Sequence, residues 1–304
     1  MMKLTKVSTG YPHAVTAFSV HIVHVVYAFL ISAVGLHFGA HNAIAAGSDT
    51  ATPCMRYGFK AGDSLVFRVR GIDTLDFETR IARRREEMYS YVCDHVTQSG
   101  QQFLRVTLES ARSTENTVGK SDSVTRTSSP WIGRTAYIIL DSNGRRVLAR
   151  QGDTVRSAVS PGGAFQPTVL FVGPDTACHA VNNRRSWLIT TTDSLAESAW
   201  PAPVIRSTYS CTLLDTTVGT TKCTAIRYAQ TGQGSFKSIS DDVGVVLHSI
   251  IDGFGKYILE NNSHLPLCGE LNSRVKVQVR MEKLSRKGTI RHRIIFERVY
   301  SSRP

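Results

Sequence analysis

Apolar and polar side chains alternate along most of the chain beyond residue 46. In residues 274–281 the apolar positions Val275, Val277, Val279 and Met281 alternate without exception with polar ones. In a β-strand successive side chains point to opposite faces, so a period of two separates an apolar face from a polar one. This segment therefore predicts a strand with one buried and one solvated face.

The same period recurs elsewhere. After a turn predicted at residues 285–288, the chain places Ile290, Ile294 and Phe296 on one face, which predicts a long terminal hairpin. A second hairpin is predicted around Asn143-Gly144, a dipeptide that favours tight turns. The remaining predicted strands cover residues 64–70, 87–96, 103–110, 135–140, 145–149, 186–192, 207–214, 222–228, 244–251 and 256–260, the last two being joined by a turn at 252–255.

Signals for helices are few. Residues 79–88 have the charge density of a helix, whereas residues 113–130 and 151–167 are rich in Ser, Thr, Gly and Pro and read as loops. We therefore predict a mainly β fold for residues 47–304. It is a single domain of about ten antiparallel strands in meander order, curved into a half-barrel or open barrel.

The N-terminal segment has the layout of an export signal. Lys3 and Lys6 precede residues 14–36, which contain no Asp, Glu, Lys or Arg, and a run of small residues follows at 43–46. This pattern predicts a hydrophobic signal helix within a signal peptide over residues 1–46. Because residues 14–36 are also long enough to cross a bilayer, an uncleaved single-pass anchor is the alternative. Either interpretation places the chain in the periplasm or outside the cell.

The location predicts the oxidation state of the cysteines. An even number of cysteines, six, in an exported chain indicates disulfides rather than metal ligands. Folding the strands at 207–214 and 222–228 about Thr217 places Cys211 opposite Cys223, within reach of a bridge. The other four cysteines allow three connectivities, of which we favour Cys93 with Cys178 and Cys54 with Cys268.

The chain is basic, with a formal net charge of +12. Its positive residues are scattered, which argues against a nucleic-acid partner and favours anionic lipid headgroups or other polyanions of the cell envelope. The alternative is that the charge only serves solubility.

No catalytic motif follows the leader. Residues 118–121 end like a phosphate loop but lack its earlier glycine, and no metalloprotease helix or nucleophile elbow is present. The histidines beyond the leader are isolated in sequence; they are His95, His179, His248, His264 and His292. Asp241-Asp242 and Asp73 with Asp76 could bind calcium, but no series of oxygen ligands at loop spacing supports this. We therefore predict no enzyme activity, no metal and no cofactor.

Several short segments resemble those of a family of uncharacterised exported bacterial β proteins: residues 62–67, 129–134, 160–163, 165–167, 186–188 and 231–235. More loosely, the strand opening at residues 62–64 and the final hairpin are similar to periplasmic lipoprotein-carrier and lipid-carrier half-barrels. That similarity implies an acyl chain held against a curved sheet, and it implies no residue roles.

Two functions from different classes remain. The first is a non-enzymatic envelope protein that binds or carries a lipid or lipoprotein acyl chain in a sheet concavity. Its predicted ligand-binding residues are Phe67, Trp131, Trp187, Val277, Val279, Ile294 and Phe296. The second is a structural or interaction protein of the cell surface with a fully packed core and no ligand. The sequence leaves the oligomeric state open.

Overall fold

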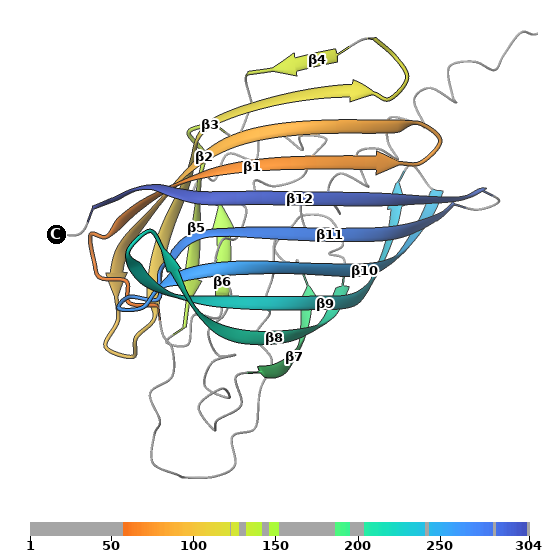
Figure 1. Cartoon of the computed structure of the whole chain (residues 1–304). Helices are drawn as coiled ribbons and strands as arrows, with labels where there is room; N and C mark the ends of the chain where they lie inside the picture. The colour runs from red at the N-terminus through yellow and green to blue at the C-terminus, as the bar shows by residue number, and fades with distance from the viewer. Residues whose placement is uncertain are drawn as a thin grey trace, which may run out of the picture.

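The residues that the structure describes form one curved antiparallel sheet (Figure 1). The computed structural model describes residues 57–121, 123–127, 132–141, 146–151, 186–194, 204–240, 243–281 and 284–302. Within these residues the chain forms twelve strands: β1 (Ser64–Asp76), β2 (Arg80–Val96), β3 (Gln102–Thr117), β4 (Ser123–Arg126), β5 (Thr135–Leu140), β6 (Arg146–Gln151), β7 (Ser186–Ser194), β8 (Val204–Val218), β9 (Thr221–Ser240), β10 (Val243–Glu260), β11 (Pro266–Met281) and β12 (Leu284–Ser302).

The sheet consists of two meanders, which are joined where the first long strand, β1, pairs with the last strand, β12. Its order is β6-β5-β3-β2-β1-β12-β11-β10-β9-β8-β7, with β4 paired to β3. Strands β1 and β12 pair from Ser64 opposite Ser302 to Asp76 opposite Thr289. Figure 1 shows the sheet curling from β3 round to β8 as an open half-barrel, with β5 and β6 turning behind it. The predicted mainly β fold is confirmed.

Several predicted boundaries were wrong. Residues 252–255 lie inside the continuous strand β10, and the turn predicted at 285–288 lies inside β12, because Met281 pairs directly with Leu284. Residues 80–88, given helical charge density above, belong to β2. Part of the loop predicted at 113–130 forms the end of β3 and the short strand β4.

A belt of aromatic rings crosses the concave face. The rings are in contact in the order Tyr209, Tyr228, Tyr257, Phe296, Phe67 and Tyr91, from β8 to β2, with centroid separations of 5.9, 6.0, 5.6, 6.1 and 5.5 Å. Four of the six are fully buried. Tilted and edge-to-face contacts of this kind stabilise beyond the area that they bury, so the belt fastens seven adjacent strands to one core.

Strand β11 contributes a glycine to this belt instead of a ring. Gly269 lies opposite Tyr257 on one side and Phe296 on the other. A Cβ atom at Gly269 would lie 2.4 Å from a ring carbon of Phe296 and 2.8 Å from the carbonyl oxygen of Lys256. Because the position carries no side chain, the rings of Tyr257 and Phe296 meet across the strand, which tightens the curvature.

The cysteines in the described residues are free. The predicted bridge between Cys211 and Cys223 is wrong, because β8 and β9 continue past the turn that we placed at Thr217. Cys211 lies opposite Tyr228, and Cys223 lies opposite Thr216. Cys93 and Cys268 are also free thiols, and their favoured partners, Cys178 and Cys54, lie outside the described residues.

The export segment is outside the described residues, so the signal peptide and the alternative anchor over residues 14–36 stay predictions. Among the residues that the structure describes, none forms a helix of sufficient length and apolarity to span a bilayer.

The contact over Gly269 can be tested by a double-mutant cycle. We expect Gly269→Ala to lower the free energy of unfolding by about 1–3 kcal/mol, because the new methyl group overpacks a buried ring. Adding Phe296→Leu removes the ring, so the double variant should lose less stability than the sum of the two single variants. Urea denaturation of all four proteins measures this coupling. Additive losses would show that Gly269 does not make room for Phe296.

Candidate functional site

A row of polar side chains crosses the concave face between two apolar zones. It is defined by register, each position lying opposite the next on the neighbouring strand. Its polar residues are Gln230 on β9, Ser273 on β11, His292 on β12, Asp73 on β1 and Arg83 on β2, and Gly253 occupies the position on β10. Buried polar groups are uncommon on the apolar face of a strand, because each needs a partner to offset its desolvation. We call this set the polar row.

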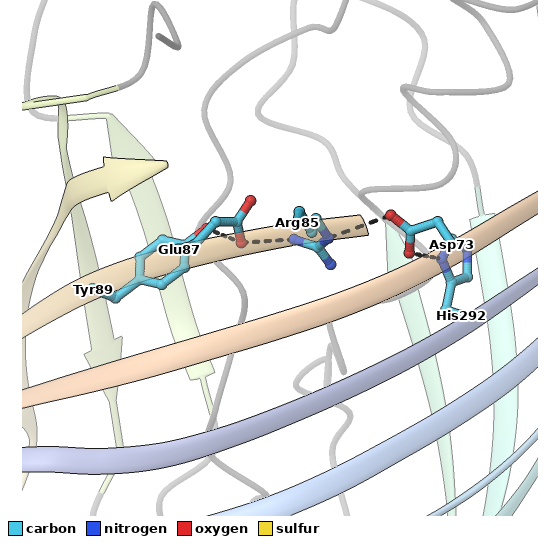
Figure 2. Close-up of polar contacts among 5 residues, drawn as sticks. All are labelled: Asp73, Arg85, Glu87, Tyr89 and His292. Atoms are coloured by element: carbon cyan, nitrogen blue, oxygen red, sulfur yellow. Dashed lines mark hydrogen bonds and ion pairs between the residues drawn. The ribbon is translucent and has the colours of Figure 1, made fainter. Parts of the chain in front are cut away.

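The polar row joins a buried network of charges (Figure 2). Nδ1 of His292 lies 2.8 Å from Oδ1 of Asp73, and Oδ2 of Asp73 lies 3.4 Å from Nε of Arg85. Nη1 of Arg85 donates a hydrogen bond of 2.7 Å to Glu87, which also accepts one of 3.2 Å from the hydroxyl of Tyr89. Figure 2 shows these side chains following one another along β2, β1 and β12.

Arg85 reaches both carboxylates because a glycine lies beneath it. Gly71 is its register partner on β1, and a Cβ atom there would lie 2.6 Å from Nε and 2.8 Å from Cγ of Arg85. The side chain of Arg85 therefore lies flat across the backbone of β1. From there its guanidinium bridges Asp73, two residues further along β1, and Glu87 on its own strand.

The network fixes the charges of its members. Burial by itself raises the pKa of Asp73, but the charge of Arg85 and the hydrogen bond from His292 outweigh it and lower the pKa to about 2. Burial also disfavours the charged form of Arg85, and the carboxylates of Glu87 and Asp73 more than compensate, so its pKa is raised. Asp73 and Arg85 therefore stay ionised at neutral pH.

Several buried polar atoms in and near this region have no hydrogen-bond partner in the part of the chain that the structure describes. They are Nε2 of His292, the hydroxyls of Ser249 and Tyr257, and Nε of Arg85, whose contact with Asp73 is an ion pair. Leaving a buried polar atom unpaired costs about 1–3 kcal/mol. Such atoms are positions at which a polar group of a ligand would gain a hydrogen bond.

The apolar zones on the two sides of the polar row differ in packing. On one side the aromatic belt belongs to a continuous core that includes Phe67, Ile294 and Phe296, each 0% exposed. On the other side the buried residues, which we call the tail zone, are not members of the core cluster formed by the described residues; they are Leu247, Ile251, Val275, Val277, Val279 and Ile290.

The structure thus divides the predicted ligand-binding residues between two environments. Phe67, Ile294 and Phe296 pack in the core, whereas Val277 and Val279 lie in the tail zone. Trp131 lies outside the described residues, and of Trp187 only the place of its backbone on β7 is described. Ligand binding by these residues stays a prediction.

Sequence reasoning missed the polar row, although it left a signal. In β1 the inward positions run Leu65, Phe67, Val69, Gly71 and Asp73, which places a carboxylate on the apolar face. In β12, His292 stands between the inward residues Ile290 and Ile294. A charged or titratable residue at an inward position of an alternating strand was therefore the available clue.

Comparison with known proteins adds little to this geometry. No protein-family model and no curated protein matches the chain, so the resemblance to a family of exported β proteins has no support beyond the β-rich fold. Among solved structures, the chain is similar to the crystal structure of Pseudomonas aeruginosa OccK5 (OpdH), with 7% sequence identity and a TM-score of 0.23. That match covers 80% of this chain and 100% of the other, and a score this low supports no inference about function.

The low pKa of Asp73 predicts acid sensitivity. A carboxylate whose pKa falls from its ordinary value of 3.8 to about 2 on folding stabilises the protein above pH 3.8 and loses that contribution as the pH falls toward 2. The shift corresponds to about 2 kcal/mol. We expect Asp73→Asn to be less stable at neutral pH and to lose less stability between pH 4 and 2 than the unmodified chain, as measured by urea denaturation at each pH.

Asp252→Asn is the matched control, because this carboxylate is exposed on the outer face. It should reproduce the acid profile of the unmodified protein. If Asp73→Asn also did so, the carboxylate of Asp73 would make no contribution to stability that depends on pH.

Proposed function

We propose that the protein is a non-enzymatic protein of the cell envelope that binds an amphipathic ligand, a lipid or an acylated group, on the concave face of its sheet. In this proposal the acyl chain lies along the tail zone, and the polar end of the ligand lies at the polar row. The observation that carries the proposal is a buried charged network with an apolar zone on each side, only one of which belongs to the core formed by the described residues.

Small residues in register with the tail zone support this placement. The row through Val277 places Gly234, Ser249 and Val277 opposite one another on β9, β10 and β11. Small side chains on three adjacent strands leave depth on a concave face, whereas the corresponding row of the aromatic belt carries Tyr257 and Phe296. An acyl chain gains stability from burial in proportion to the apolar area removed from water.

The charged network favours binding over catalysis. His292 and Asp73 share the hydrogen bond typical of a general base and its orienting group. However, no hydroxyl or thiol of the described residues forms a hydrogen bond with Nε2 of His292. We therefore propose that His292 offers Nε2 to the polar end of the ligand and that Asp73 fixes the orientation of its ring.

The second candidate is a structural or interaction protein of the cell surface with no ligand. The observation that favours it is the closeness of the packing at the aromatic belt, where Phe67 contacts both Tyr91 and Phe296 and all three are 0% exposed. If the tail zone is filled in the same way, the concave face has no room for an acyl chain.

The substitution Val277→Phe separates the two candidates. In a ligand-binding protein the larger ring occupies space that the acyl chain would take, so the melting temperature should be kept and binding of cis-parinaric acid, a fluorescent fatty acid, should be lost. In a packed core the ring would destabilise the protein by about 1–3 kcal/mol. Thermal unfolding and fluorescence titration measure the two results.

Val69→Phe is the control, since Val69 belongs to the core cluster and is 0% exposed. It should lower the melting temperature under both candidates. No binding of the fatty acid by the unmodified chain, together with equal destabilisation by the two variants, would refute the ligand-binding proposal.

A further inference from the structure

The outer, convex face of the sheet is unevenly charged. Toward one end its arginines are matched by carboxylates: Arg68 and Arg70 each lie 3.3 Å from Glu297, and Arg293 lies 2.8 Å from Glu270. These pairs are exposed, so each contributes little to stability, but together they balance the charge of that region.

The other end carries cations without such partners. Arg274, Lys276 and Arg280 alternate along the outer face of β11 and are exposed, and Arg291 is exposed beside them on β12. None of these four forms an ion pair with a carboxylate of the described residues, although the exposed Asp252 lies opposite Arg274 in register. Arg274 and Arg291 are direct register partners, an arrangement of like charges that destabilises a sheet.

Two large apolar side chains project from the same face. Ile250 is 57% exposed and Phe254 is 62% exposed, and both lie on β10. Ile250 is the register partner of Lys276 on one side and of Gln233 on the other. Exposed apolar groups among unpaired cations are costly in an isolated protein and are typical of a surface that meets an amphipathic partner.

A groove of about 400 Å³ adjoins these side chains. It lies at β8, β9 and β10; its lining includes the exposed polar residues Arg206, Gln233, Ser235 and His248 of the outer face and, between them, the buried Gly234 and Ser249. Ile250 forms part of the same lining. A guanidinium, an amide and a hydroxyl around one groove can donate hydrogen bonds to an anionic headgroup.

From these observations we propose that this part of the convex face docks on a bilayer of anionic phospholipid. We call it the docking patch; it comprises Arg206, Ile250, Phe254, Arg274, Lys276, Arg280 and Arg291. The cations attract the negative surface, Ile250 and Phe254 enter the boundary between headgroups and acyl chains, and the groove receives a lipid headgroup. Ile250 in particular favours a bilayer over a nucleic acid, since an aliphatic side chain cannot stack on bases as an aromatic ring does.

This proposal is independent of ligand binding on the concave face, because the inward and outward positions of β11 are different residues. Either proposal can fail without the other.

The test uses flotation of the full chain with vesicles of phosphatidylcholine alone or with phosphatidylglycerol. We expect Lys276→Glu with Arg280→Glu to reduce binding to the anionic vesicles by about tenfold or more, since each basic residue near such a surface contributes measurably. Attachment through the apolar residues 14–36 would act on both kinds of vesicle alike, so the extra binding to the anionic vesicles over the neutral ones is the quantity that reports the patch. Raising the salt to about 0.5 M should remove the difference between the two proteins.

The matched control is Lys120→Glu with Lys222→Glu, which changes the net charge equally at exposed positions outside the patch. It should bind the anionic vesicles like the unmodified chain. An equal loss in both pairs would show attraction by net charge alone and would overturn the proposal, as would no loss in either pair.

The apolar contribution is tested in the same assay. Ile250→Ser with Phe254→Ser should weaken binding, whereas Val118→Ser with Val124→Ser, at exposed valines elsewhere, should not. Tight binding of a single-stranded oligonucleotide that is abolished by Lys276→Glu with Arg280→Glu, with no binding to vesicles, would assign the patch to nucleic acid and overturn the proposal.

Discussion

Contact of long side chains with the backbone of inward-facing glycines is the constraint on which the rest of this structure depends. Curling a sheet crowds the side chains on its concave face, and a Cβ atom at every inward position would not fit. The rings of Phe296 and Tyr228 lie over Gly269 and Gly255, and Arg85 lies over Gly71. The same device therefore provides the curvature, the continuous aromatic belt and the position of the guanidinium between its two carboxylates.

The charged network also depends on the pairing of β1 with β12. Asp73 and His292 are 219 residues apart in sequence and meet because these two strands lie side by side in the sheet. A meander by itself brings together only strands that follow each other along the chain. The site is thus a product of the whole topology, and no single hairpin contains it.

This explains which features could be predicted from the sequence. Alternation is local, so the inward face of β11, with Val277 and Val279, could be identified from residues 274–281 alone. Register depends on the position of the turn. Because β8 and β9 extend beyond Thr217, the turn comes later in the sequence than predicted, and Cys211 does not lie opposite Cys223. The glycines of residues 252–255 led to the wrong prediction of a turn. In the structure, side chains from β9 cover these glycines, and the pairing of β9 with β10 could not be predicted from the local pattern.

Strand β11 shows how one alternating segment can serve two surfaces. Its inward residues Val275, Val277 and Val279 face the concave side, while Arg274, Lys276 and Arg280 face outward without carboxylate partners among the described residues. Stability alone does not require this outward set, since Arg274 stands opposite Arg291. A sheet that only enclosed a core could carry balanced pairs along its whole outer face, as it does around Glu297. The unbalanced cations therefore point to a partner outside the fold, and they do so whichever way the concave face is filled.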